Sequence, residues 1–85
     1  MNMSGSKAAK PSEQWESLAR NLLRGEIKRR GLNYGGLIEK LALIGVRETE
    51  CSIKNKICRG RFSFIFFLQC MRALEVEWIS VPRPS

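Results

Sequence analysis

The chain has 85 residues, 44% of them hydrophobic, so it can form one small domain and is too apolar for a disordered segment. Its formal net charge is +7, which favours a polyanionic partner: nucleic acid first, an anionic membrane surface second. No apolar run approaches the roughly 20 residues of a membrane span, and the N-terminus lacks the pattern of a signal peptide.

The three cysteines and the absence of histidine limit the chemistry. An odd cysteine count without a CxxC pair predicts neither a disulfide framework nor a zinc site, and free thiols fit a reducing cytoplasm. Without histidine, a phosphate-binding glycine loop or a paired-carboxylate motif, we expect no enzymatic activity. The sequence therefore predicts a cytoplasmic protein with no metal, no cofactor and no membrane partner.

Residues 1–10 are small, polar and basic, and we expect a flexible N-terminal arm. A first helix is predicted from about Ser12, as N-cap, to Gly31, which ends it. Apolar residues recur at helical spacing within it and predict one buried stripe. These residues are Trp15, Leu18, Leu22, Leu23 and Ile27.

A second helix is expected to follow Asn33, a favourable cap, with Tyr34, Leu37, Ile38 and Leu41 on its inner face. The pair Gly35–Gly36 in its first turn is unfavourable for a helix by roughly 1 kcal/mol per glycine. Either the helix starts late, or its backbone approaches another group closely there.

A third helix over residues 49–59 is the most informative element. Gly45 to Glu48 form the preceding turn, and Thr49 is the expected cap. Ile53 and Ile57 lie four residues apart on one face, and about 100° per residue places Asn55 opposite them. The outer face is therefore polar and cationic.

A fourth helix is predicted to start near Ser63 and is apolar on nearly every side. Its expected inward stripe is Phe64, Phe67, Leu68, Met71 and Leu74. The remaining apolar residues predict a homodimer interface made of Ile65, Phe66, Cys70, Trp78 and Ile79. Two alternatives stay open. The C-terminal segment can fold back over the fourth helix within one chain, and residues 75–81 can form a fifth helical turn or an extended segment.

From Leu22 to Ile79 this order of elements resembles the lambda-repressor-like helix-turn-helix family of bacterial and phage regulators. The matching motifs are Arg29 to Tyr34, Leu37 to Leu41, Ile53 and Ile57 followed by Arg59-Gly60, and Leu68, Met71, Ala73, Leu74 and Val76. The run Lys56 to Phe62 also resembles an uncharacterised bacterial domain family with a Lys-Ile-x-Arg-Gly-x-Phe signature. The resemblance implies an all-α, compact four- to five-helix domain over residues 11–81, with 82–85 as a C-terminal tail.

The expected function is sequence-specific binding of double-stranded DNA by a small bacterial, phage or plasmid transcriptional regulator. The third helix would enter the major groove, with Asn55 pairing with adenine and Arg59 or Lys56 pairing with guanine. Phosphate contacts are expected from Arg47, Ser52, Lys54 and Arg61. The alternative is a protein-interaction module or inhibitor from a mobile element, whose basic face blocks a host nucleic-acid-binding protein.

Overall fold

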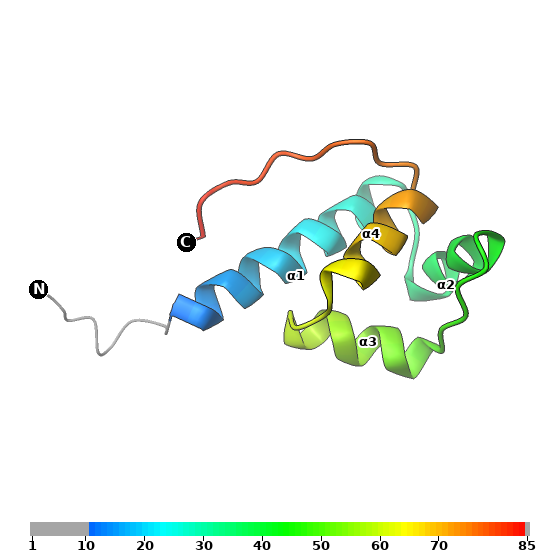
Figure 1. Cartoon of the computed structure of the whole chain (residues 1–85), viewed down its shortest axis with the longest axis horizontal. Coiled ribbons are helices and arrows are strands. Elements are labelled where there is room, and N and C mark those ends of the chain that lie inside the picture. Colours follow the sequence, from blue (N-terminus) through cyan, green and yellow to red (C-terminus); the bar gives the residue numbers. More distant parts are fainter. Residues whose placement is uncertain (1–10, 85) are drawn as a thin grey trace, which may run out of the picture.

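The structure is a computed structural model that describes residues 11–84, which form four helices and no strand (Figure 1). The helices are α1 (Pro11–Arg29), α2 (Tyr34–Leu43), α3 (Glu50–Arg59) and α4 (Phe64–Ala73). The fold is therefore all-α, as predicted. Residues 75–81 form no fifth helical turn and belong to an extended segment; residues 75–84, here called the C-terminal strap, are non-helical. The expected arm over residues 1–10 lies outside the described residues.

Three of the helices begin with the same capping chemistry. In each, the side-chain oxygen of the residue before the helix accepts a hydrogen bond from the backbone N–H three residues later. The first two caps were expected, and the third agrees with the predicted start of the fourth helix. The caps, with their donor–acceptor distances, are Asn33 (2.8 Å), Thr49 (3.1 Å) and Ser63 (2.9 Å).

The first helix departs from the prediction at its N-terminal end. α1 begins at Pro11, so Ser12 lies inside the first turn and is not its cap. Proline is favoured at the start of a helix, because the first N–H groups have no intrahelical partner. Of the predicted α1 stripe, only Leu23 and Ile27 are buried, whereas Trp15 is 57% exposed.

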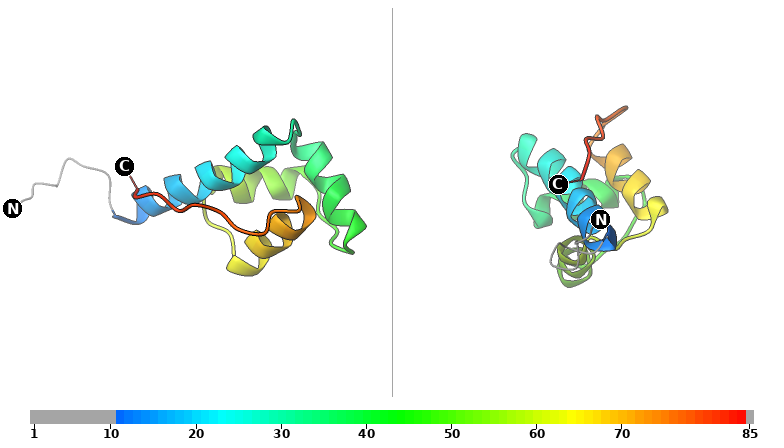
Figure 2. Two further views of the ribbon diagram at one scale, coloured as in Figure 1. Left: turned by 90° about the horizontal axis from the view of Figure 1, so that it is seen from above. Right: turned by 90° about the vertical axis from the view of Figure 1, so that its left-hand side faces the viewer.

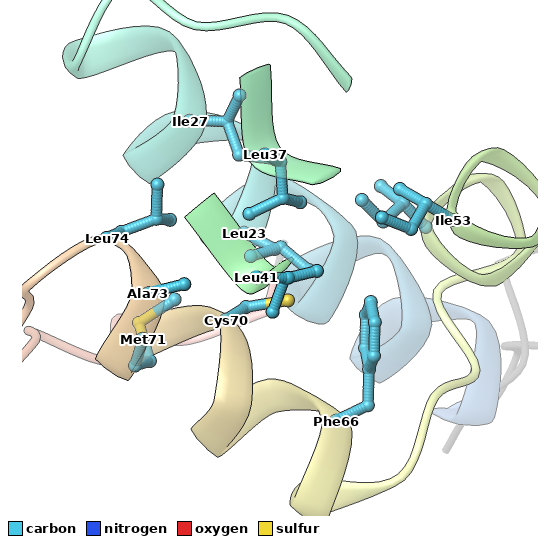
Figure 3. Close-up of a cluster of buried hydrophobic side chains, with 11 residues drawn as sticks. Leu23, Ile27, Leu37, Leu41, Ile53, Phe66, Cys70, Met71, Ala73 and Leu74 are labelled. Atoms are coloured by element: carbon cyan, nitrogen blue, oxygen red, sulfur yellow. The ribbon is translucent and has the colours of Figure 1, made fainter. Parts of the chain in front are cut away.

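The core lies where the four helices meet (Figure 3). α3 packs against α1 and α2, and α4 packs against α2. Gly36 shows how closely the backbone packs, because a Cβ there would lie 2.9 Å from Leu32 Cδ2. A late helix start is therefore wrong, because α2 begins at Tyr34, and the group that Gly36 approaches is the Leu32 side chain in the preceding loop. The buried apolar residues are Leu23, Ile27, Leu37, Leu41, Ile53, Ile57, Phe66, Cys70, Met71, Ala73 and Leu74.

The predicted orientation of α4 is wrong in its first two turns, although Met71 and Leu74 are buried as predicted. Phe66 and Cys70, expected at a dimer interface, are 3% and 0% exposed within one chain. Phe64 and Leu68, expected in the core, are instead 70% and 50% exposed. Both orientations satisfy helical spacing, because α4 is apolar on nearly every side. The structure selects the stripe in which the small Cys70 side chain lies at the crowded centre, beside Leu41 (Figure 3).

After α4 the C-terminal strap turns back and runs along α1 towards its first turn (Figure 2). Arg30 Nε donates a 2.8 Å hydrogen bond to the Leu74 carbonyl, which fixes the start of the strap. The buried Glu26 carboxylate holds this arginine at 2.6 Å and Arg29 at 2.7 Å. The segment thus folds back within one chain, but it lies along α1 and leaves the outer face of α4 exposed. Within residues 11–84, no helix combines the length and apolar character needed to cross a bilayer.

Candidate nucleic-acid interface

The orientation of α3 agrees with the prediction. Ile53 and Ile57 are fully buried, while Cys51, Asn55 and Arg59 on the opposite side are exposed. Two buried isoleucines one turn apart fix the rotation of a short helix, because turning it would expose both of them. The polar side chains of α3 therefore project from a rigid support.

The C-terminal end of α3 is locked onto α1. Gly60 ends the helix with φ +67°, and a Cβ at this position would lie 2.2 Å from the Glu16 carbonyl oxygen. Only glycine combines this left-handed conformation with so close an approach of two backbones. Arg20 Nη1 donates a 2.9 Å hydrogen bond to the Cys58 carbonyl and so caps the same end. The glycine of the Arg59-Gly60 pair at the end of α3 therefore has a structural role.

A shallow hollow on the outer side of α3 gathers five of the seven residues predicted to bind DNA: Ser52, Asn55, Lys56, Arg59 and Arg61. We call it the α3 hollow; Thr49 and Cys51 complete its lining. Lys54 and Arg47 lie outside the hollow, and both are exposed. The structure thus brings most of the predicted residues to one surface and places the other two beside it.

Two of the cations predicted to bind DNA already have partners within the chain. Lys56 Nζ lies 2.9 Å from a Glu48 carboxylate oxygen and 4.6 Å from the centre of the buried Phe66 ring. Arg61 forms an ion pair with Glu16. These carboxylates partly neutralise both cations, so each has less charge available to a nucleic acid than an unpaired cation.

Ser52 also has an internal partner, since its hydroxyl donates a 3.0 Å hydrogen bond to Glu48. Arg47, Lys54 and Arg59, in contrast, form no ion pair with any residue between 11 and 84. These three exposed cations keep their full charge available to an external anion. Asn55 is exposed beside them, and its side-chain amide donates only a long 3.8 Å hydrogen bond to Cys51 Sγ on the same helix.

The sequence analysis missed the contribution of α1 to this surface. Arg24 Nη2 lies 3.4 Å from Cys58 Sγ, and its Nε lies 3.4 Å from the Tyr34 hydroxyl. The hydrogen bond to Tyr34 raises the pKa of the Arg24 guanidinium, so it stays charged. Arg20 lies one turn earlier. The i, i+4 spacing of these two arginines indicates that they share one face of α1, and the structure places that face against α3.

Charge is distributed unevenly along α3. Glu48 and Glu50 lie at its N-terminal end, whereas Arg59 lies in its last turn, with Arg24 of α1 nearby. Acidic residues at the N-terminus and basic residues at the C-terminus both stabilise a helix through its dipole. The same distribution makes the C-terminal half of α3 the more attractive half for a polyanion.

Comparison with known families gives one result. A family model described as "Domain of unknown function (DUF6471)" matches residues 15–79, which is most of the chain. The chain belongs to this family. No curated protein matches the chain, and no solved structure does.

The cysteines of this DUF6471 domain fall into two classes. Cys51 and Cys58 are exposed on α3, while Cys70 is buried in the core. Burial raises the pKa of the Cys70 thiol to about 12, with a smaller contribution from the negative charge of Glu48. The core thiol is therefore unreactive at neutral pH, and only the two α3 thiols are accessible to reagents.

The residues predicted for the homodimer interface, other than the buried Phe66 and Cys70, lie apart from the α3 hollow. Trp78 is 81% exposed and lines an apolar groove with Phe64. Ile79 also lines this groove and is half-buried against the core. Ile65 is exposed on α4 but does not line the groove. Of the five residues predicted for the interface, the structure therefore leaves only Trp78 and Ile79 on a common open surface.

Proposed function

We propose that this domain binds double-stranded DNA in a sequence-specific manner and acts as a small bacterial, phage or plasmid transcriptional regulator of helix-turn-helix type. The observation that carries the proposal is the surface of α3: Lys54 and Arg59 are exposed without an ion pair, and Asn55 is exposed with only a long 3.8 Å hydrogen bond to Cys51 Sγ, on a helix whose other face is locked into the core. A rigid helix with free polar groups suits major-groove recognition, because base-edge hydrogen bonds need fixed geometry.

Each free side chain has a separate part in this proposal. Asn55 carries the donor and acceptor that a bidentate pair with adenine requires, and Arg59 can form the corresponding pair with guanine. Lys54 and Arg47 lie outside the α3 hollow, where they can contact phosphates. Arg24 of α1 adds a phosphate contact beside the C-terminal half of α3.

Electrostatics favours one direction of approach. Glu50 is exposed in the first turn of α3 and offsets part of the attraction that Arg47 exerts on phosphates at that end. Arg59 and Arg24 at the other end attract them. We therefore expect the DNA backbone to pass close to the junction of α1 and α3, with base contacts made from the middle and C-terminal turns of α3.

The alternative function, blocking of a host nucleic-acid-binding protein by this basic face, uses the same exposed cations. Both readings place the protein in the cytoplasm, because its free thiols suit a reducing compartment. They differ in the ligand. A regulator enriches defined DNA sequences from a random pool, whereas an inhibitor enriches none and captures a protein from lysate.

Selection of bound duplexes from a random DNA pool tests the proposal directly. We expect one enriched motif with the wild-type domain and altered preference at one adenine position with Asn55→Ala. Lys54→Ala is the matched control on the same helix: it removes a phosphate contact and should weaken all duplexes alike without changing the motif. Absence of any enriched motif would reject sequence-specific binding, and an unchanged motif with Asn55→Ala would reject the assigned reading residue.

A further inference from the structure

An apolar groove runs along the side of the molecule formed by α1, α4 and the C-terminal strap, with a volume of about 570 Å³. Leu22 of α1 lies on its floor, Phe64 and Leu68 of α4 form one wall, and Trp78 and Val81 of the strap form the other. Figure 2 shows the strap running back beside α1, on the side of α1 where α4 also lies. We call the space between these five residues the apolar groove.

The groove is open, and its walls are exposed. Trp78 is 81% exposed, Phe64 70% and Val81 63%. Trp15, which is 57% exposed, lies two turns before Leu22 on the same face of α1. Isolated apolar residues are common on a protein surface, but a groove whose walls include the exposed Phe64 and Trp78 rings is characteristic of an interaction site.

We propose that a second copy of this chain covers the apolar groove, in a symmetric dimer whose two straps run antiparallel across a twofold axis. This inference concerns a surface separate from the α3 hollow, so it stands whether or not the domain binds DNA. It also corrects the sequence-based interface, because it uses Phe64, Leu68, Trp78 and Val81 and excludes Ile65, Phe66 and Cys70.

The exposed area is the first argument for a second copy. With roughly 150–250 Å² for each aromatic side chain, the exposed parts of the groove walls and Trp15 amount to about 500 Å² of apolar surface. A stable interface of ordinary size buries about 800 Å² per partner, of which about 60% is apolar. The groove therefore offers the apolar area that one partner contributes to a stable dimer.

The charges that flank the groove are the second argument. Glu77 lies at the end of the strap near α4, and Arg83 lies beyond Val81 near the start of α1. A twofold axis through the middle of the strap reverses its direction, so it brings Glu77 of one chain opposite Arg83 of the other. Because the interface is isologous, this pairing occurs twice, and opposite charges meet at both ends of the apolar contact.

The position of the groove leaves the α3 hollow free. α3 contacts α1 along Glu16, Arg20 and Arg24, whereas the groove floor is formed by Ala19 and Leu22. At about 100° per residue these two sets lie on different sides of α1. A dimer formed through the groove therefore presents two α3 surfaces at once, and a DNA site for it would be palindromic.

The mass of the protein in solution, without DNA, tests this inference. We expect the wild-type chain at micromolar concentration to sediment with twice its monomer mass of 9.7 kDa, and Phe64→Ser with Leu68→Ser to sediment as a monomer. Ile65→Ser is the matched control, since it removes an equally exposed apolar side chain from the same helix outside the groove. Circular dichroism of each variant verifies that α4 stays folded.

Charge reversal tests the antiparallel arrangement. Glu77→Arg alone and Arg83→Glu alone should each weaken the dimer about tenfold, and the double variant should recover wild-type association. A wild-type chain that stays monomeric up to high micromolar concentration would overturn the proposal. So would a dimer that Ile65→Ser disrupts as strongly as Phe64→Ser, or a double charge variant that associates no better than the single ones.

Discussion

The two sides of α1 present opposite kinds of surface. On one side α3 displays amide, guanidinium and ammonium groups; on the other, the apolar groove displays aromatic rings. On each surface, some side chains already contact other parts of the chain, and others do not. Lys56 and Arg61 on the first side, like Phe66 on the second, are engaged within the chain. The residues left over, rather than composition alone, indicate where a partner binds.

The difference also lies in how firmly the two surfaces are held. The α3 surface is fixed by a buried pair of isoleucines, a backbone contact at Gly60 and the hydrogen bond from Arg20. One wall of the groove is a non-helical strap, anchored at its start by Arg30 and Leu74. We therefore expect the α3 surface to be preformed and the strap wall to adjust when a partner binds.

The largest expected effect is a difference in reaction rate between the two thiols on the α3 surface and the Cys70 thiol, which is buried in the core. Under native conditions Cys51 and Cys58 should react with a maleimide at least ~1000-fold faster than Cys70, whose labelling requires global unfolding. Bound duplex DNA should slow the reaction of the α3 thiols, whereas dimerisation through the groove should not. Mass spectrometry of each site over time measures all three rates.

The Cys70 pKa adds a pH dependence to the same measurement. Its folded pKa of about 12 exceeds the unfolded value of 9.0, so the unfolded chain releases its proton first. The contribution of the buried Cys70 thiol to the free energy of unfolding is therefore fully present below about pH 9 and is lost as pH rises towards 12. Fast labelling of Cys70 at neutral pH would show that the core assignment of α4 is wrong.

The next largest effect concerns the junction that both surfaces share. Gly60→Ala should lower the free energy of unfolding by about 3 kcal/mol, because it adds a strained φ and a clash with the Glu16 backbone. Gly25→Ala is the matched control within α1: no atom lies within 4 Å of its Cβ position. It should stabilise the helix by roughly 0.5–1 kcal/mol. Urea unfolding curves measure both, and an equal response at the two glycines would contradict the close contact of α1 and α3.

A charge-reversal pair then acts on the α3 surface alone. Lys54→Glu with Arg59→Glu should weaken duplex binding by about 100-fold, since two free cations become repulsive. Lys40→Glu with Arg72→Glu changes the net charge equally on another part of the surface and should weaken binding far less. Fluorescence anisotropy with labelled duplex measures both. Equal losses would mean that only net charge matters.

The smallest effect is expected where the strap begins. Glu75 adopts φ +61°, a left-handed conformation that glycine provides after α1 and α2, at Gly31 and Gly45. Glu75→Gly should therefore stabilise the fold by about 1 kcal/mol, because the strain of a side chain in this conformation is removed. Thermal unfolding measures the change, and DNA affinity should stay unaltered. A lower melting temperature would show that the Glu75 side chain has a stabilising role not apparent from its contacts.

The sequence predicted what depends on neighbouring residues. The caps at Asn33 and Thr49 follow from side-chain chemistry within one turn, and the inward face of α3 follows from two isoleucines in a polar helix. α4 could not be oriented in this way, because apolar residues on all sides satisfy several stripes. Its orientation depends on the shape of the core around Cys70, which spacing does not encode.

The ion pairs of the candidate site show the same limit. Lys56 is eight residues from Glu48, and Arg61 is 45 residues from Glu16, so nothing local in the sequence marks them as paired. They could therefore not be separated from the free Lys54 before the tertiary structure was known. The shared face of Arg20 and Arg24 on α1 was accessible, because their repeat has helical spacing, but the contact of that face with α3 was not.

The central claim is that free cations around α3 bind the phosphate backbone of DNA, and a salt titration of duplex binding tests it most directly. With Arg47, Lys54, Arg59 and Arg24 each neutralising one phosphate, log affinity should fall with log salt at a slope of about −3 to −4 per domain. Lys54→Ala should reduce this slope by about 1. Affinity that stays constant between about 50 and 200 mM salt, or no binding at either concentration, would contradict the account.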